Sequence, residues 1–187
     1  MSKDDVKIVV VGDGAVGKTA LITTFGENRF PSEYEPTVND TYEVKINYEE
    51  VGEVTLKLWD TAGQDEFKSV RPIAYNGANA FVVCFDLSSK DTLLNACDKW
   101  RKELGNLGPR QCPKILVGNK KDLRDVKLAN GEECVTTDYG QEMCDKYKFF
   151  AYVETSAKLF DNTSTAFQEA VKAAKEMEKV TGGSGGG

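Results

Sequence analysis

The sequence contains no histidine among its 187 residues, and its longest apolar runs extend over only a handful of residues. Without an imidazole, acid–base catalysis by histidine is excluded. Apolar runs of this length are too short to cross a bilayer. Basic residues are also outnumbered, because 24 Lys and Arg stand against 30 Asp and Glu, which gives a net charge of −6. This balance argues against nucleic-acid binding, which requires a basic face.

Targeting signals are absent from the N-terminus as well. Residues 1–5 contain no apolar segment that would indicate secretion, and Ser2 stands where N-myristoylation requires Gly. The five cysteines lack metal-like spacing, and we expect free thiols in a reducing cytoplasm. Length and composition favour a single domain over residues 1–180, followed by a flexible Gly/Ser tail at 181–187.

A phosphate-binding loop pattern, G-x-x-x-x-G-K-[ST], is present at Gly12-Asp13-Gly14-Ala15-Val16-Gly17-Lys18-Thr19. It follows an apolar β-branched run at 7–11 and precedes an apolar segment at 20–25, the strand–loop–helix order that such a loop requires. Its backbone N–H groups and the following helix dipole suit a polyphosphate. We expect Lys18 to reach the β and γ phosphates and the Thr19 hydroxyl to ligate Mg²⁺. The alternative is a flexible glycine turn.

Strand-like and helix-like segments alternate along the chain, which predicts an α/β fold with a mostly parallel six-stranded sheet and helices on both faces. The strand patterns at 42–48 and 54–59 flank a short turn and predict a hairpin, hence one antiparallel edge strand. The other strands are expected at 7–11, 80–85, 114–118 and 149–153, and the helices at 18–25, 91–104, 138–147 and 163–179.

Some stretches lack a regular hydrophobic period. The polar segments 27–41 and 60–77 are expected to be loops, and long loops in compact domains are often functional. Residues 125–136 show no clear period either. Asp138 with Gln141 resembles a capping box that opens the third predicted helix.

Ligands of open α/β sheets bind outside the carboxyl ends of the strands, so the residues after each strand are site candidates. Asp60 follows the third strand as a carboxylate that can hold Mg²⁺ directly or through water. Gly63 leaves a backbone N–H free for a γ-phosphate, and Gln64 is placed to orient the attacking water. Thr37, in the first long loop, is the candidate for a further Mg²⁺ ligand. The alternative for Asp60–Gln64 is a tight turn after a strand. The alternative for Thr37 is a threonine of a loop without a role.

The fifth strand is followed by Asn119-Lys120-Lys121-Asp122. The Asp122 carboxylate can accept two N–H bonds from guanine, whereas adenine offers no such donor pair. Asn119 is expected to tie the loops together, and the Lys120 stem to cover a face of the base. After the sixth strand, the small residues of 155–158 would let a backbone N–H approach the base carbonyl. A charged, solvated turn is the alternative for 119–122, and 155–158 is the least specific of the motifs.

In this order, the motifs resemble those of the Ras superfamily of small GTPases over about residues 6–179. Within the superfamily the chain is most similar to the Rho family. The stretches that carry the likeness are 12–19, Tyr34-x-Pro36-Thr37-Val38, 58–64, Arg71-Pro72-Ile73-Ala74-Tyr75 and Lys99-Trp100. The resemblance implies a P-loop NTPase G domain and a switch that binds guanine nucleotide (GTP or GDP) and Mg²⁺, hydrolyses GTP and regulates the actin cytoskeleton.

The resemblance also implies site residues. Phe30 would pack edge-on against guanine, Tyr34 would close over the phosphates, and Ala157 N–H would meet guanine O6. Changes at Gly14 or Gln64 would block hydrolysis. The implied nucleotide-binding set is Gly14, Ala15, Val16, Gly17, Lys18, Thr19, Ala20, Phe30, Tyr34, Thr37, Asp60, Gly63, Asn119, Lys120, Asp122, Ser156, Ala157 and Lys158; the catalytic set is Gln64, Lys18 and Thr37; the metal ligands are Thr19, Thr37 and, through water, Asp60.

By the same resemblance, a monomer would present switch I (about 30–42) and switch II (about 60–76) to exchange factors, GTPase-activating proteins, a dissociation inhibitor and effectors. The family's anchor is a prenyl group on a C-terminal cysteine, which would hold the full-length protein at the cytoplasmic face of the plasma membrane and the cytoskeleton. The last cysteine here is Cys144, so we expect a truncated form.

Two further departures concern function. Glu35 and Asn39 stand where Rho proteins usually carry apolar residues, which predicts an altered set of exchange factors and effectors. Residues 125–139 are shorter and less charged than the Rho insert helix, which predicts that this helix is shortened or missing.

Two other functions stay open at this stage. The first is a P-loop kinase for a small molecule, against which the scattered arginines argue, because such kinases often have an Arg-rich lid. The second is a module that binds GTP without turnover, against which the presence of Gly14, Thr37 and Gln64 argues. No Arg lies between Phe30 and Thr37, which predicts slow intrinsic hydrolysis and an arginine supplied by an activating protein.

Overall fold

A computed structural model describes residues 4–32 and 39–182, and in these residues the chain forms one six-stranded sheet. The sheet has the order β2-β3-β1-β4-β5-β6. Its strands are β1 (Asp5–Gly12), β2 (Asn39–Tyr48), β3 (Gly52–Thr61), β4 (Ala80–Asp86), β5 (Lys114–Asn119) and β6 (Ala151–Glu154). Only the edge pair β2–β3 is antiparallel. The predicted α/β fold, with its one antiparallel edge strand, is therefore confirmed.

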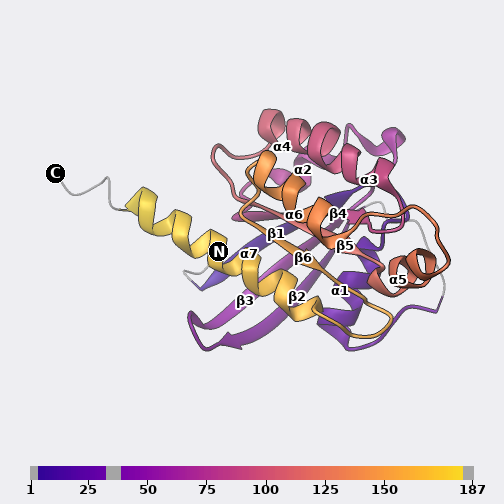
Figure 1. Ribbon diagram of the computed structural model, residues 1–187. Coiled ribbons are helices and arrows are strands. Elements are labelled where there is room, and N and C mark those ends of the chain that lie inside the picture. Colours follow the sequence, from indigo (N-terminus) through magenta and orange to yellow (C-terminus); the bar gives the residue numbers. More distant parts are fainter. Residues whose placement is uncertain (1–3, 33–38, 183–187) are drawn as a thin grey trace.

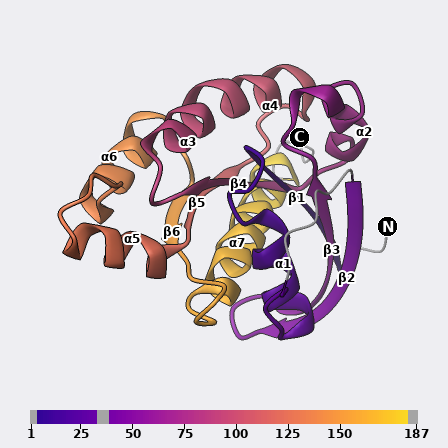
Figure 2. The same ribbon diagram turned by 90° about the vertical axis from the view of Figure 1, so that its right-hand side faces the viewer.

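Helices cover both faces of the sheet (Figures 1 and 2). One face carries α1 (Lys18–Glu27) and α7 (Thr163–Gly182), which pack on each other through stacked Phe25 and Phe167 rings. The other face carries α2 (Arg71–Tyr75), α3 (Lys90–Asn95), α4 (Arg101–Leu107) and α6 (Thr137–Lys146). The short helix α5 (Lys121–Ala129) follows the carboxyl end of β5.

The central strand β1 shows why the sequence reveals this arrangement. Val6, Ile8 and Val10 belong to the core beneath α1 and α7, whereas Val9 and Val11 belong to the core beneath the opposite helices. Side chains alternate between the two faces of a strand. A strand buried on both faces is therefore apolar at nearly every position, and its sequence shows an almost continuous apolar run.

The edge strand β2 begins earlier than predicted. It pairs with β3 from Asn39 to Tyr48, so the loop expected to reach Thr41 already belongs to the sheet from Asn39 on. The prediction was wrong here because an edge strand tolerates polar residues: Asp40 and Thr41 are exposed. The turn at Gly52, with φ +80°, is the predicted hairpin turn.

The helical segment after β4 runs further than predicted. Helix α3, a π-helical turn at Ala96–Trp100 and α4 follow one another without a break from Lys90 to Leu107. The predicted helix 91–104 was expected to stop at the glycine that follows it, but this Gly105 lies inside α4. The helix ends instead at Gly108, whose backbone is extended, because the next residue, Pro109, disfavours a helical conformation before it.

Helix α5 occupies part of a stretch in which no regular element was expected. Its only buried residue is Arg124, and its apolar side chains Leu123, Val126 and Leu128 are exposed, so it packs no apolar stripe on the core. In the described residues 130–136 no helix follows it, which agrees with a shortened insert. The capping box predicted at Asp138 was wrong, because Thr136 caps α6 by accepting a hydrogen bond from the Tyr139 N–H at 3.2 Å.

Several other element ends differ from the predictions by a few residues. Helix α1 continues to Glu27, and α7 continues to Gly182, two residues into the segment expected to be the tail. Strand β6 begins at Ala151 rather than at 149. Across the described residues, none of the helices combines the length and the apolar composition that a membrane span requires.

All five cysteines are buried free thiols. Burial raises the pKa of Cys84 and Cys112 to about 12, and that of Cys97 and Cys144 to about 11. At pH 8 these four thiols are therefore protonated and shielded, and only thiolates react with disulfide reagents. We expect Ellman's reagent to label these thiols slowly in the native protein and all five at once in guanidinium. Labelling of the native protein at the unfolded rate would contradict this picture.

Candidate functional site

Two adjoining hollows open at the carboxyl ends of the parallel strands, where ligands of such sheets bind. The first, of about 310 Å³, is lined by Gly14, Ala15, Gly17, Lys18, Thr19, Ala20, Phe30, Pro31, Ser32, Thr61, Ala62, Gly63, Gln64 and Lys120. The second, of about 230 Å³, is lined by Gly17, Ala20, Phe30, Asn119, Lys120, Asp122, Leu123, Ala157 and Lys158. They share four residues and so form one continuous site.

The phosphate-binding loop forms the floor of the first hollow. Gly17 precedes α1 with φ +94°, a left-handed conformation that suits glycine. The Lys18 Nζ donates to the carbonyl oxygens of Gly12 at 3.0 Å and Asp13 at 2.6 Å. Burial lowers the pKa of this lysine, and the nearby carboxylates of Asp13 and Asp60 oppose the shift. The loop therefore holds a nearly buried cation beside its own curled backbone.

The first residues of α1 meet the end of β3. The Thr19 Oγ1 donates to the Asp60 Oδ2 at 2.5 Å, and Asp60 is fully buried. Among the described residues no cluster of three or more Asp, Glu, His or Cys side chains could hold a metal ion. A hydroxyl and one carboxylate fit Mg²⁺, which prefers oxygen ligands, keeps several waters and is commonly completed by phosphate oxygens.

The segment after β3 presses its backbone against the phosphate-binding loop. A Cβ added at Gly63 would lie 2.3 Å from the Gly12 carbonyl oxygen and 2.6 Å from the Gly14 nitrogen, so only glycine fits. A Cβ added at Gly14 would lie 3.8 Å from the Gln64 side-chain amide. The Gln64 side chain therefore lies over Gly14, and a side chain at position 14 would contact it.

The second hollow is built by the loops after β5 and β6. The Asn119 Nδ2 donates to the Val16 carbonyl oxygen at 3.0 Å, and its Oδ1 accepts from the Thr155 Oγ1 at 2.7 Å. The Ser156 Oγ donates to the Asp122 Oδ1 at 2.8 Å. Three segments distant in sequence are thus joined by side-chain hydrogen bonds.

Lys120 connects the two hollows. Its backbone is left-handed, with φ +63°. Its Nζ donates to the Ala15 carbonyl oxygen at 2.7 Å and pairs with the Asp86 carboxylate at 3.3 Å. With both ends of the side chain held, the aliphatic stem lines the second hollow beside Ala157.

Most of the predicted site residues meet at these two hollows. Val16, Asp60 and Ser156 do not line them and instead support residues that do. Tyr34 and Thr37, together with Glu35, belong to residues 33–38 of the predicted switch I, which lie outside the described residues.

A buried charged cluster behind the switch II segment was not foreseen. Arg71 is fully buried and donates to the carbonyl oxygens of Ala62 at 3.1 Å and Gln64 at 2.9 Å. Its Nη2 also donates to the Glu103 carboxylate at 2.8 Å, which accepts from the Tyr75 hydroxyl too. Arg71 therefore fixes the backbone of the segment that carries Gln64. The sequence shows only an arginine in a polar stretch, without a signal that it is buried.

The π-helical turn supplies a second unforeseen support. Asn95 and Trp100 donate to the two carboxylate oxygens of Asp13 at 2.7 Å and 2.8 Å. The turn places these donors beside the phosphate-binding loop, and π-helical turns are frequent at functional sites. Lys99 and Trp100 carried part of the family likeness, but their sequence does not indicate a contact with Asp13.

Comparison with known proteins gives a match along nearly the whole chain. Residues 7–176 match the model of the Ras family. The "Ras-like GTP-binding protein RhoL" of Drosophila melanogaster is 40% identical over 175 residues, which cover 94% of this chain and 90% of that protein. The "Rho-related protein racC" of Entamoeba histolytica is 41% identical over 173 residues, which cover 89% of this chain and 88% of that protein.

Proposed function

The chain belongs to the Ras family, and we propose that it is a Rho-type signalling switch that regulates the actin cytoskeleton by binding effectors in its GTP state. It is a GTP-binding protein and a GTPase, as its family and Rho-related relatives are. In the proposed cycle, the γ-phosphate holds both switch segments in an ordered form, and hydrolysis releases them. Partners would distinguish the ordered switch segments from the released ones.

One observation carries the proposal. The phosphate-binding loop, the Gly63–Gln64 backbone and the loops that carry Asp122 and Ala157 surround one continuous site. A nucleotide needs a polyphosphate cradle and a base pocket side by side. The first hollow offers backbone N–H groups and the buried Lys18 cation, and the second offers an apolar wall and a carboxylate.

In this assignment, the phosphates lie over residues 14–20, where Lys18 contacts the β and γ groups. Thr19 and Thr37 would ligate Mg²⁺, with Asp60 behind a water molecule. When bound, the ion neutralises charge on the phosphate oxygens. Gln64 would orient the attacking water, and a larger residue at position 14 would disturb it, because the Gln64 side chain lies in contact distance of that position.

The base would occupy the second hollow. Asp122 accepts from the N1 and N2 donors of guanine, the Ala157 N–H meets O6, and the stem of Lys120 and the ring of Phe30 cover the faces. Ser156 and Asn119 hold these groups from behind, and Lys158 completes the wall. Because Asp122 also accepts from Ser156, its orientation is fixed before a nucleotide arrives.

Regulators and effectors would bind next to the switch segments. A groove of about 560 Å³ runs between the hairpin and the residues after α2, and its lining includes Tyr42, Trp59 and Asn76. Tyr42 and Asn76 end the two predicted switches, so a partner in this groove would contact both. This groove supports exchange factors, activating proteins, a dissociation inhibitor and effectors as partners, and we propose that the protein acts as a monomer. We further propose that a prenyl anchor places the protein at the plasma membrane.

Phosphate release from the GTP-loaded chain tests the switch. We expect slow single-turnover hydrolysis, on the order of 10⁻⁴ to 10⁻² s⁻¹, because the activating arginine comes from another protein. No release over a day would contradict turnover. Fast turnover by the pure chain would contradict the need for an activating protein. In pull-downs, actin regulators should bind the GTP-loaded chain and not the GDP form.

Asp122→Asn tests the base assignment. The change turns one acceptor into a donor that opposes guanine, so we expect GDP affinity to fall by about 10- to 100-fold. Xanthosine diphosphate, which carries oxygen in place of the 2-amino group, should lose less affinity or gain some. Titration with both fluorescently labelled nucleotides measures the change. Asp138→Asn, the same substitution at an exposed site in α6, should alter neither affinity; equal losses for both nucleotides in Asp122→Asn would contradict the assignment.

A further inference from the structure

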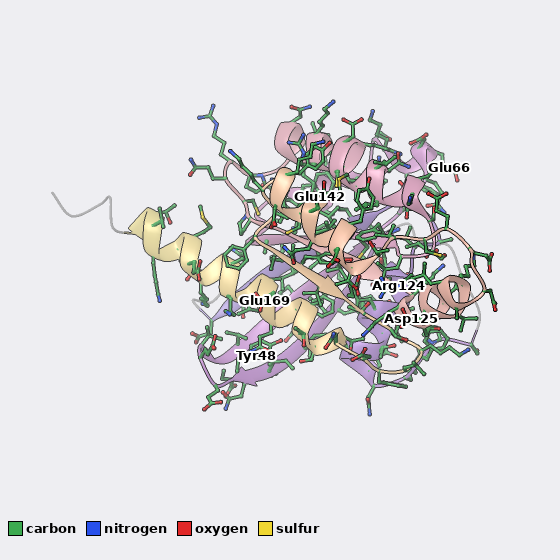
Figure 3. The ribbon with its side chains drawn as sticks, viewed as in Figure 1. Tyr48, Glu66, Arg124, Asp125, Glu142 and Glu169 are labelled. Carbon is green, nitrogen blue, oxygen red and sulfur yellow. The ribbon has the colours of Figure 1, made fainter. Side chains whose placement is uncertain are left out.

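Arg124 is a buried charge that the proposed nucleotide contacts do not use. It lies in α5, two residues after Asp122, but it lines neither hollow. It is only 3% exposed and lies between α5 and the sheet (Figure 3). Arginine is almost never fully buried unless it is paired, so its partners indicate its role.

The guanidinium of Arg124 joins three segments of the chain. Its Nη1 and Nη2 donate in parallel to the two carboxylate oxygens of Glu154, the last residue of β6, each at 2.9 Å. Nη1 also donates to the Val135 carbonyl oxygen at 2.9 Å, and Nε donates to the Asp125 carboxylate at 2.7 Å. Such a bidentate pair fixes geometry as well as charge.

Several hydrogen bonds also hold the Glu154 carboxylate in place. Its carboxylate accepts from the Thr137 hydroxyl at 2.7 Å and the Tyr152 hydroxyl at 2.6 Å, in addition to Arg124. Burial raises the pKa of this carboxyl, but the hydrogen bonds from Arg124, Tyr152 and Thr137 outweigh it and hold the pKa below its usual value. The pair is therefore ionised at neutral pH.

The position of the pair in the chain links it to the second hollow. Glu154 directly precedes the loop 155–158, and Arg124 lies in α5 two residues after Asp122, which stands in the first turn of the same helix. On the side of the hollow, these two segments are joined by the Ser156–Asp122 hydrogen bond and by the Lys121 N–H, which donates to the Thr155 carbonyl oxygen at 3.0 Å. The ion pair joins the same two segments on the side away from the hollow.

We propose that the Arg124–Glu154 pair positions the two base-binding segments, the first turn of α5 and the loop 155–158, against each other and thereby sets how slowly a guanine nucleotide leaves. The inference rests on the proposed function, because it requires the base in the second hollow. The two side chains are positioning residues, which act through Asp122 and Ala157. Binding loops held in place before association lose less freedom on binding, and loosening them chiefly raises the dissociation rate.

A contribution to fold stability alone does not account for a buried ion pair such as Arg124–Glu154. Buried ion pairs often cost about as much in desolvation as they return, and neutral replacements of both partners are commonly tolerated. A purely structural pair would therefore be dispensable when both charges are removed together. A positioning pair would not be, because the connection between the two segments would still be missing.

The test compares GDP release and thermal stability in four variants: Arg124→Met, Glu154→Gln, the double variant, and the buried core truncation Val171→Ala in α7. Release of fluorescent GDP is followed after an excess of unlabelled GDP is added.

We expect release about tenfold faster in both single variants and in the double variant. The double variant should regain melting temperature relative to Arg124→Met, because it no longer buries an unpaired carboxylate, while release stays fast. Val171→Ala should melt earlier and release GDP at the wild-type rate.

Two results would overturn the inference: wild-type release from folded Arg124→Met, or release in the double variant that recovers together with its melting temperature. If Arg124→Met does not fold, Arg124→Lys takes its place. It keeps the charge but loses the parallel pair of bonds, so its release should be intermediate, and wild-type release from it would equally overturn the inference. Failure of the wild-type chain to bind any guanine nucleotide would overturn the proposed function itself.

Discussion

In the Gln64→Leu variant we expect single-turnover hydrolysis of GTP to slow by about 100-fold while GTP affinity is unchanged. Leucine has a similar length, so it fits the space over Gly14 that the glutamine occupies. It can neither donate to nor accept from the attacking water. The backbone should stay in place, because Arg71 binds the Gln64 carbonyl oxygen rather than its side chain.

Phosphate release from preloaded protein and titration with a fluorescent, non-hydrolysable GTP analogue measure the two quantities separately. The matched control is Gln141→Leu, the same change on the exposed surface of α6, where the amide donates only to Asp145. This control should hydrolyse GTP at the wild-type rate. Wild-type hydrolysis by Gln64→Leu would contradict the catalytic assignment, and so would an equal loss of analogue affinity.

The Arg71→Ala variant should lose about 3 to 5 kcal/mol of unfolding free energy, because it leaves the Glu103 carboxylate buried without its cation. It also removes the donors to Ala62 and Gln64. For a chain of this size, the melting temperature should fall by on the order of 10 °C.

The loss should depend on pH in a defined direction. In the wild type, burial raises the pKa of Glu103, but the bonds from Arg71 and Tyr75 outweigh it and keep the pKa below its usual value. The pair therefore stabilises the fold above the ordinary carboxyl pKa and less as the pH falls. In Arg71→Ala the unpaired buried carboxyl has a raised pKa, and its protonation relieves the penalty. The stability gap between wild type and variant should thus narrow from pH 8 to pH 5.

Chemical denaturation at both pH values measures this gap. The control is Lys102→Ala, which breaks an exposed pair with Asp98 on the same helical segment and should cost no more than about 0.5 kcal/mol. If Arg71→Ala is no less stable than this control, Arg71 is not the buried anchor described. A gap that widens as the pH falls would contradict the assignment of charge to Glu103.

The sequence predicts the buried strands and the motif loops well, for a physical reason. Strands β1, β4 and β5 are covered on both faces, so they are apolar at nearly every position. The motifs follow strands directly, and the topology of a parallel sheet then brings them to one edge. Short local signals therefore suffice to locate the site.

Buried charges and helix ends escape prediction because their sequence signals are ambiguous. Arg71 and Arg124 read as solvated residues, although each is buried by partners distant in sequence. Helix α5 buries Arg124 and leaves Leu123 and Val126 exposed, the reverse of what a hydrophobic pattern predicts. Likewise, Gly105 reads as a helix end, but the following Pro109 decides where α4 stops. In each of these cases, the burial of a side chain or the end of a helix depends on a residue outside the local segment from which the prediction was made.

Nucleotide competition tests the central claim, a guanine-specific switch, most directly. The wild-type chain is loaded with fluorescent GDP, and unlabelled GTP, GDP or ATP is added in increasing concentration. Because the site offers a carboxylate acceptor for the donors of guanine, we predict that GTP and GDP displace the label alike and that ATP is weaker by about 10³-fold or more. Equal displacement by ATP and GTP would contradict the claim and favour a P-loop kinase.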